Sequence, residues 1–383
     1  MQQTIFDVLY PKFKIDKPIR LIELFAGYGS QALALKYLGV KFEHWKICEW
    51  AVKSIQAYKD IHFTDDKEDY SKMYSKEYLI EQLHYWGISN NYNDPMPKEQ
   101  IKRLSEDKIR QIYNNIIATH NLVNIQQAKG EDLEINDKDH CYIMTYSFPC
   151  QDLSLAGNGK GMHDNSTRSG MLWEVERILK EISRGGGLLP NLLLMENVPQ
   201  VHSQDNMKDF HKWQCFLESL GYKNYFQDLI VTDYGIPQIR NRCFMVSILG
   251  DYSYTFPKPT PLKLKLKDML ESNVPEKYYL SQKMVQGMIN TKFHQYQLEN
   301  RLQDLESSID TLTTSTGERA PHVIKDIPKL PIKNATNKGY LEAELGDGID
   351  ISSRMEYHRG TVQKGKSQTI TTMGGGRCRS GSL

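Results

Sequence analysis

Apolar runs and amphipathic segments alternate along this chain in a pattern typical of a sheet covered by helices. Short runs rich in Ile, Leu, Val and aromatic residues predict strands at residues 19–25, 42–47, 122–126, 141–145, 191–195, 225–231 and 243–249. Segments with helical periodicity lie between them, at residues 31–38, 76–86, 98–120, 166–182 and 209–220. Alternating strands and helices favour parallel pairing, so we predict an α/β fold with a doubly wound, mostly parallel sheet.

Two stretches interrupt the alternation and indicate how the chain is organised. Residues 61–123 are polar and rich in Tyr, Lys, Asp and Asn, which predicts a helical insertion in the core fold. A solvated helical surface is its simplest interpretation, and a contact with DNA or a partner is the alternative. The Pro-rich residues 257–261 mark a boundary. We therefore predict a first domain at residues 1–255 and a second, smaller domain at 256–383.

Composition excludes several classes of protein without selecting one. The 383 residues include 48 Lys and Arg against 47 Asp and Glu, so the net charge of +1 does not predict a polyanionic partner. The six cysteines show neither Cys-x-x-Cys nor a Cys/His metal spacing, which argues against a disulfide framework and a zinc site. No apolar stretch reaches the roughly 20 residues of a membrane span, and residues 1–17 lack an apolar signal core. The expected location is a reducing cytoplasm, with no membrane partner.

The first predicted strand leads into a glycine turn of a kind that binds ligands. Gly27 and Gly29 stand between this strand and the next helix, so that backbone N–H groups and a helix N-terminus would face a ligand. Glu49 ends the second strand about 20 residues later, where nucleotide-type ligands place a ribose hydroxyl. The pattern lacks the full dinucleotide fingerprint and the P-loop Lys-Ser/Thr, which favours an adenosyl ligand. A helix-capping glycine with a surface acid is the alternative.

Candidate catalytic side chains follow later strands. Cys150 comes after a buried strand and before a Gly-rich loop, a position suited to a nucleophile, although a lone cysteine is more often a buried apolar residue. Glu196 ends the next strand at the same sheet edge and could donate a proton there; a helix cap or a surface salt bridge is the alternative. Arg240 and Arg242, two apart on one predicted strand, would point the same way and hold a phosphate or a base, unless they form surface salt bridges. His202 is expected to be a polar surface residue.

Five motifs in one order resemble the cytosine-C5 DNA methyltransferase family of restriction–modification or phage type. They are Phe25-Ala26-Gly27-Tyr28-Gly29, Glu49-Trp50, Pro149-Cys150-Gln151, Glu196-Asn197-Val198 and Gln238-x-Arg240-x-Arg242. The resemblance covers about residues 19–250, and the Pro-Cys-Gln and Glu-Asn-Val pair is its most specific part. The chain departs from the family at Ser30, where a second glycine is usual. It also lacks the family's Arg-Lys-Leu-x-Pro-Arg-Glu and Gly-Asn-Ser type segments before Leu383.

The resemblance implies a class I, Rossmann-like methyltransferase that methylates C5 of a cytosine in a specific DNA sequence. Cys150, as a thiolate, would add to C6 of the ring, and Glu196 would hydrogen-bond or protonate N3 and the exocyclic amine. Asn197 would orient the loop. Arg240 and Arg242 would contact the cytosine or the backbone. The target base would have to leave the duplex to reach these groups.

The same resemblance implies that S-adenosyl-L-methionine is the cofactor. Phe25, Gly27 and Gly29 would line the methionine side, Glu49 would hold the ribose hydroxyls, and Trp50 would pack on the adenine. Asp132 would accept from the adenine amino group, and Pro149 would close the pocket near the sulfonium. The complete predicted cofactor set is Phe25, Ala26, Gly27, Tyr28, Gly29, Glu49, Trp50, Asp132, Leu133 and Pro149. The stretch 147–165 is suited to closing over a flipped nucleotide.

The last third of the chain resembles the family's target-recognition region. Residues 310–314 and 368–372 are similar Thr-rich, β-prone pieces, and helical pieces are expected within 276–306. Residues 354–383 carry six Lys and Arg against one acid, which suits contact with the backbone of double-stranded DNA. A solvated basic tail is the alternative.

The missing terminal segments lead to a further expectation. The chain would be either a truncated product or one half of an enzyme completed by a second polypeptide, and it would be poorly active alone. Two other functions stay open: a catalytically silent remnant that binds DNA or cofactor, and a tRNA cytosine-C5 methyltransferase. The long basic recognition region argues against the second of these.

Overall fold

The structure is a computed structural model that divides into two compact units. It describes residues 11–150, 153, 169–275, 278–281, 303–311 and 323, together with five short strands beyond residue 329. One unit comprises Met1–Asp233 and Asn241–Thr260, and the other comprises Tyr234–Arg240 and Pro261–Leu383.

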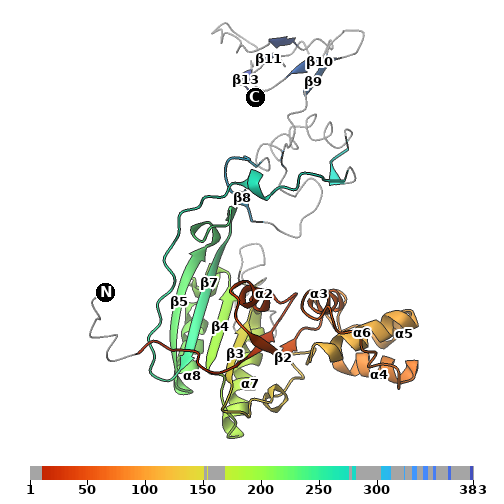
Figure 1. Cartoon of the computed structure of the whole chain (residues 1–383), viewed down its shortest axis with the longest axis vertical. Coiled ribbons are helices and arrows are strands. Elements are labelled where there is room, and N and C mark those ends of the chain that lie inside the picture. Colours follow the sequence, from red (N-terminus) through yellow and green to blue (C-terminus); the bar gives the residue numbers. More distant parts are fainter. Residues whose placement is uncertain are drawn as a thin grey trace. The chain divides into compact units, whose positions relative to one another are not determined.

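The first unit is built on a six-stranded sheet of order β2-β1-β3-β4-β7-β5 (Figure 1). Its strands are β1 Ile19–Leu24, β2 Phe42–Cys48, β3 Cys141–Tyr146, β4 Leu192–Asn197, β5 Tyr222–Ile230 and β7 Asn241–Leu249. Strands β1 to β4 are parallel, and β7 runs antiparallel to both of its neighbours. The helices of this unit are α2 Ser30–Tyr37, α3 Val52–His62, α4 Lys76–Trp86, α5 Lys98–Lys102, α6 Glu106–Ala118, α7 Leu172–Arg184 and α8 Met207–Ser219. The predicted doubly wound α/β fold is confirmed.

Both faces of the sheet are apolar at its centre, so the central strands contain consecutive apolar residues and do not alternate strictly between polar and apolar positions. Strand β3 is buried at all six positions. Its Tyr142 and Met144 belong to the main core, which also contains the apolar sides of α7 and α8. Its Cys141 and Ile143 pack with Ala32 of α2 in a second cluster. Helices therefore cover the two faces, and the loops at the strand ends are left to form a site.

The predicted strand at residues 122–126 is wrong. The chain lies beside β2 for a single bridge, Ile47 to Asn121, where the N–H of Leu122 donates to the carbonyl of Ile47 at 2.8 Å. It then turns, because Val123 is left-handed with φ 61° and the N–H of Gln127 donates to the carbonyl of Asn124 at 3.0 Å. The third strand of the sheet in chain order is β3.

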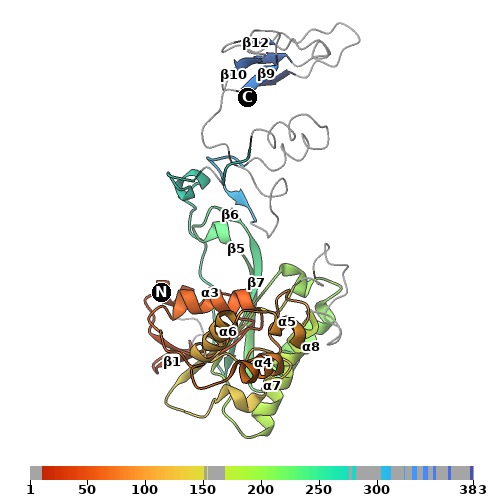
Figure 2. The same ribbon diagram turned by 90° about the vertical axis from the view of Figure 1, so that its right-hand side faces the viewer.

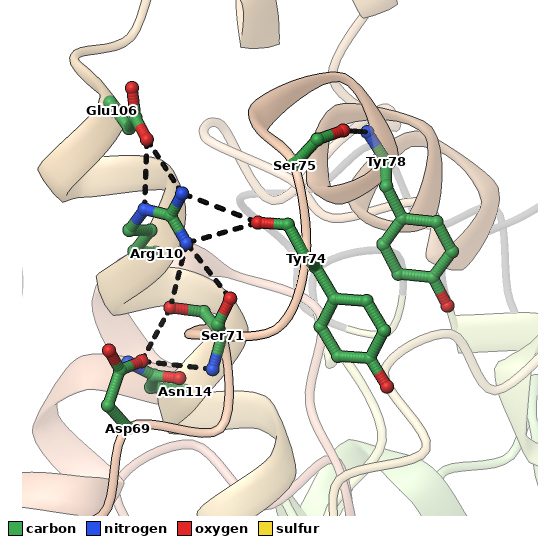
Figure 3. Close-up of polar contacts among 8 residues, drawn as sticks. All are labelled: Asp69, Ser71, Tyr74, Ser75, Tyr78, Glu106, Arg110 and Asn114. Carbon is green, nitrogen blue, oxygen red and sulfur yellow. Dashed lines mark hydrogen bonds and ion pairs between the residues drawn. The ribbon is translucent and has the colours of Figure 1, made fainter.

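The polar stretch after α3 folds into the helices α4, α5 and α6, which pack with α3 around an apolar cluster of their own (Figure 2). The predicted helix at 98–120 is broken, because Ser105 caps α6 by accepting from the N–H of Lys108. Figure 3 shows the polar contacts through which Arg110 of α6 fixes the loop before α4. Its guanidinium donates to the Ser71 carbonyl at 2.9 Å and pairs with Glu106 at 2.7 Å. A role of this subdomain in binding DNA or a partner stays a prediction.

The described part of the second unit consists of short β pairings. Its elements are β6 Gln238–Ile239, the 3-10 helix Leu266–Met269, β8 Ile309–Asp310, β9 Leu330–Lys333, β10 Tyr340–Ala343, β11 Gly348–Asp350, β12 Thr361–Gln363 and β13 Ser380–Ser382. Strand β6 pairs with β8, β9 with β10, and β11 with both β12 and β13. The β-prone piece 368–372 and most of the expected helical pieces at 276–306 lie outside the described residues. Among the described helices, none combines the length and hydropathy needed to cross a bilayer.

Candidate active site

The carboxyl ends of four parallel strands lie in one row, and the predicted motifs follow directly from them. Leu24 of β1 pairs with Cys48 of β2 on one side and with Tyr146 of β3 on the other, and Tyr146 pairs with Met195 of β4. The next residues along these strands are Phe25, Glu49, Ser147 and Glu196. The sheet register therefore brings the glycine turn, the second-strand acid, the Cys150 loop and the fourth-strand acid to one edge.

The turn after β1 has a sharply bent backbone. Phe25, Gly27 and Gly29 all adopt left-handed φ angles, of 57°, 56° and 78°. Glycine takes this conformation without penalty, whereas a residue with a bulky side chain rarely does so. The strain at Phe25 is therefore an outlier of the kind that collects at functional sites.

The two glycines of this turn have different surroundings. A Cβ atom added to Gly27 would meet nothing within 4 Å, so the backbone there faces open space. A Cβ atom added to Gly29 would lie 2.3 Å from His62 and 2.6 Å from Tyr58, both on α3. Gly27 thus leaves room for a ligand, and Gly29 is required for packing between the turn and α3.

Glu49 joins the first two strand ends. Its carboxylate accepts from the N–H of Gly27 at 2.9 Å and from the N–H of Ala51 at 2.7 Å. Burial raises the pKa of Glu49 to about 7, although these backbone hydrogen bonds act in the opposite direction. The carboxyl group is therefore held in place at the edge of the open space beside Gly27.

Asn121 is a site residue that sequence reasoning missed. Its side-chain oxygen accepts from the N–H of Glu49 at 3.0 Å, and its side-chain nitrogen donates to the Glu49 carbonyl at 2.9 Å. These two hydrogen bonds fix the backbone N–H and the backbone carbonyl of Glu49. The single bridge between Asn121 and Ile47 brings the two segments together, and no motif of the sequence marks it.

The other predicted cofactor residues have varied surroundings. Ala26 is buried, whereas Tyr28 is 58% exposed. Trp50 is half-buried against the apolar cluster of α3 to α6. Asp132 accepts from the N–H of Lys129 at 2.8 Å within the 3-10 helix Gly130–Leu133. The Leu133 side chain is fully buried in the main core.

The loop that carries Cys150 is fastened to the neighbouring strand. Asn197, at the end of β4, is buried, and its side-chain nitrogen donates to the carbonyl of Phe148 at 3.0 Å. Its side-chain oxygen accepts from the N–H of Val198 at 2.8 Å. Pro149 and Cys150 are half-buried, and the Cys150 side chain packs against the main core. Most of the predicted closing stretch at 147–165 lies outside the described residues.

Glu196 forms an ion pair across the sheet. Arg242, on β7, approaches its carboxylate at 2.9 Å, and both side chains are partly exposed, at 18% for the arginine and 23% for the acid. The prediction that Arg240 shares a strand with Arg242 is wrong. Arg240 lies between β6 and β7 and belongs to the second unit, because the chain changes units at residues 240 and 241.

His202 is not the surface residue that the sequence predicted. It ends the 3-10 helix Pro199–His202 that follows β4, and its Nε2 atom lies 2.9 Å from Oδ1 of Asp228 on β5. The side chain is only 24% exposed, and its ring packs near Phe210 and Phe226.

The sheet order, the antiparallel β7 and the motif-bearing strand ends define a Rossmann-like methyltransferase of class I. The family model described as C-5 cytosine-specific DNA methylase matches residues 100–377. The chain belongs to that family, and the predicted resemblance is confirmed. The family uses S-adenosylmethionine as its methyl donor.

Individual relatives agree with this assignment. The orphan methyltransferase M.SssI of Spiroplasma monobiae is 34% identical over 325 residues, which cover 81% of this chain and 83% of that protein. The type II methyltransferase M2.ScrFI of Lactococcus lactis subsp. cremoris is 34% identical over 70% of this chain and 71% of that protein. The solved structure of the Entamoeba histolytica methyltransferase EhMeth covers 86% of this chain and 84% of its own, with 14% identity and a TM-score of 0.51, a likeness of fold alone.

The residues at the edge of β1 and β2 fit an adenosyl cofactor. Gly27 leaves a space that any side chain would fill, and the Glu49 carboxylate stands beside it with lone pairs left for hydroxyl donors. An acid at the end of the second strand is the expected partner of a ribose. The fit rests on the geometry of these two residues.

Proposed function

We propose that this chain transfers a methyl group from S-adenosylmethionine to C5 of cytosine in DNA, with Cys150 as the nucleophile and Glu196 as the group that activates the ring. The observation that carries the proposal is the register of β3 and β4, in which Tyr146 lies opposite Met195. The Cys150 loop and Glu196 thus leave adjacent strands at the same edge. The Asn197 hydrogen bond to Phe148 ties the two together.

The chemistry assigned to these residues is covalent activation. C5 of cytosine is a poor nucleophile, and attack by the Cys150 thiolate on C6 forms an Sγ–C6 bond and moves the ring electrons toward C5. Glu196 stabilises the developing charge by hydrogen bonding or proton donation at N3. The cofactor, when bound, supplies an electrophilic methyl group on a sulfonium. After C5 is methylated, its proton leaves to a base, the Sγ–C6 bond breaks, and the thiolate is regenerated.

Arg242 has a positioning role in this proposal. Arg242 lies on β7, which pairs with β4. Its guanidinium is 2.9 Å from the Glu196 carboxylate and holds it in place. An arginine there limits the directions in which the acid can point. Arg240 is assigned a contact with the cytosine or the DNA backbone.

The cofactor is assigned to the edge of β1 and β2. Glu49 would accept from the ribose hydroxyls, Gly27 would let the backbone approach the methionine part, and Trp50 would pack on the adenine. Phe25, Asp132 and Pro149 complete the proposed pocket. The buried carboxyl of Glu49 accepts from the N–H groups of Gly27 and Ala51, and Asn121 fixes the Glu49 backbone; these contacts support the assignment.

The proposal also assigns a different role to each of the two parts of the chain. Residues 1–255 would carry the chemistry, and residues 256–383 would select the DNA sequence. The target cytosine would be extruded from the duplex, because stacked neighbours cover the two ring faces from which the thiolate and the methyl donor must approach C6 and C5.

Product analysis tests this function. The full chain is incubated with S-adenosylmethionine labelled in the methyl group and with unmethylated genomic DNA, and the DNA is digested to nucleosides for mass spectrometry. We expect labelled 5-methyldeoxycytidine from the native chain, and none from Cys150→Ser. The matched control is Cys215→Ser, which removes an exposed thiol on α8 and should keep the native activity.

Other products would contradict the proposal. Label in N4-methyldeoxycytidine would replace the C5 mechanism with amine methylation. Label in tRNA alone, with an RNA mixture offered in parallel, would assign the chain to the tRNA alternative. Full activity of Cys150→Ser would remove the proposed nucleophile.

A further inference from the structure

Three potential metal ligands lie together outside the proposed catalytic groups. They are the imidazole of His202, the carboxylate of Asp228 and the thiol of Cys243, and their ligand atoms all lie within 4.8 Å of one another. The residues are far apart in sequence, which is why the spacing of cysteines and histidines along the chain did not predict a metal site.

The sheet brings this cluster together. Asp228 of β5 lies directly opposite Cys243 of β7, so their side chains point to the same face. His202 approaches from the 3-10 helix that follows β4, and its Nε2 atom lies 2.9 Å from the Asp228 carboxylate. The three donors therefore come from three elements of one unit, which hold them in fixed positions.

The donor set indicates which ion would bind. An imidazole nitrogen, a carboxylate oxygen and a thiolate sulfur are the ligands of zinc, and three protein ligands with a water molecule form a common tetrahedral arrangement. Calcium and magnesium prefer oxygen donors throughout. We propose that His202, Asp228 and Cys243 form a binding site for a transition-metal dication of the zinc type.

Burial in the cluster suits such an ion. The Cys243 side chain is fully buried, whereas the side chains of His202 and Asp228 are 24% and 33% exposed. An ion can thus enter from the solvent side and reach the thiol at the bottom. The thiolate is a soft ligand, which favours a cation with strong affinity for sulfur.

The site adjoins the catalytic acid. Cys243 pairs across the sheet with Asn197, which holds the Cys150 loop, and it follows Arg242, which holds Glu196. A metal ion on Cys243 would therefore link β5 and β7 to the 3-10 helix that follows β4, next to these groups. The role is structural, and it is independent of whether the chain methylates DNA.

Cobalt titration tests the site. The full chain is stripped with a chelator and titrated with Co²⁺, and the thiolate-to-cobalt absorption band is recorded; Zn²⁺ is then added to displace the cobalt. We expect one equivalent of Co²⁺ to bind with a thiolate band. In Cys243→Ser the band should disappear. His202→Gln and Asp228→Asn should each weaken binding by at least about 100-fold, because each removes a direct ligand of the ion, and the loss of a group that only supports a ligand already costs about 10- to 100-fold.

Two controls address the thiols of Cys215 and Cys150, which are exposed and half-buried. Cys215 lies 3.6 Å from His211 on the exposed side of α8 and forms another Cys/His pair, so Cys215→Ser should leave the band intact. Cys150→Ser should leave it intact as well. Circular dichroism of each variant checks folding, and the His202 and Asp228 variants retain the buried thiol if Cys243→Ser fails to fold.

Several results would overturn the proposal. These are the absence of a thiolate band in the native chain, its persistence in folded Cys243→Ser, and its loss in Cys215→Ser or Cys150→Ser. Unchanged affinity in folded His202→Gln and Asp228→Asn would reduce the cluster to an ion pair beside a buried cysteine.

Discussion

Two asparagines position the groups that the proposed chemistry needs. Asn197 donates to the Phe148 carbonyl and so fixes the start of the Cys150 loop. Asn121 accepts from the N–H of Glu49 and donates to its carbonyl. A side-chain amide can donate and accept at once, so it can bridge two backbone segments that do not pair as strands.

Replacing Asn121 with Ala should weaken cofactor binding. The substitution leaves the N–H and carbonyl of Glu49 without these partners, at about 1–3 kcal/mol for each buried group, and lets the acid move. We expect S-adenosylmethionine affinity, measured by isothermal titration calorimetry, to fall about 10- to 100-fold. Asn121→Asp keeps the acceptor and should give a smaller loss. Native affinity in a folded Asn121→Ala chain would show that the clamp is not needed.

The sequence predicts candidate residues whose chemistry is distinctive, and it does not predict those that act through geometry. Cys150 and Glu196 stand in short motifs with a recognisable spacing. Asn121 lies in a loop with no motif, and only the bridge to β2 reveals its contact with Glu49. His202 was expected on the surface, because its partner Asp228 comes from a strand that lies far along the chain.

At the scale of elements, the turn between β1 and α2 combines two separate demands. Gly27 faces open space and serves the proposed ligand. Gly29 starts α2 at a left-handed φ of 78° and lies against Tyr58 and His62 of α3. One motif therefore contains a glycine for binding and a glycine for packing.

The variants Gly27→Ala and Gly29→Ala form a matched pair that separates these demands. Both place Cβ at positive φ, which costs about 1–2 kcal/mol, but only Gly29→Ala adds a steric clash, worth about 1–3 kcal/mol more. In urea unfolding, Gly29→Ala should be the less stable variant. In calorimetry, Gly27→Ala should lose cofactor affinity while it remains folded. The opposite order of stabilities would refute this division.

Most elements were predictable because their patterns are local. Helix α4 matches its predicted range, 76–86, and the strands β3 and β4 are largely apolar runs. The predicted helix at 98–120 is split by the capping of Ser105, and the predicted strand at 122–126 is lost to a turn at Asn124. Arg240 falls between two strands, since the chain passes there from one unit to the other. Apolar content alone does not show where a helix is split, where a strand is replaced by a turn, or where the chain passes between units.

At the scale of the whole molecule, stability should depend on pH through buried acids. Glu23 of β1 is 1% exposed, accepts from the hydroxyl of Tyr58 at 2.6 Å, and has its pKa raised to about 7 by burial. An unfolded Glu has a pKa near 4.5, so between these values the folded chain holds a proton that the unfolded chain has lost. This contribution to the free energy of unfolding therefore falls as pH rises through that window.

Glu23→Gln should remove this pH dependence. His44, whose pKa burial lowers to about 3, acts in the opposite direction, so the prediction concerns the difference between variant and native chain. From pH 5 to pH 8, the stability of the variant relative to the native chain should rise by a few kcal/mol in urea unfolding. The exposed Glu77 on α4 provides the control, because Glu77→Gln should follow the native profile. Parallel profiles for native and Glu23→Gln would contradict the assignment.

The fold class and the family were predictable for the chain as a whole, because the order of the motifs follows the order of the strands. The register that sets Tyr146 beside Met195 could not be predicted from the sequence. This register places the Cys150 loop next to Glu196. The grouping of His202, Asp228 and Cys243 depends likewise on the pairing of β5 with β7. Such long-range pairings arise from the folded sheet rather than from any local pattern.

Covalent trapping tests the central claim, the attack of Cys150 on cytosine, most directly. The full chain is incubated with S-adenosylmethionine and duplex DNA in which 5-fluorocytosine replaces cytosine, and complexes that survive denaturation are separated by electrophoresis. Fluorine at C5 cannot leave as a proton does, so the Sγ–C6 bond should persist. We predict a denaturation-resistant adduct with the native chain and with Cys215→Ser, and none with Cys150→Ser. An adduct with Cys150→Ser, or its absence from a native chain that methylates ordinary DNA, would contradict the account.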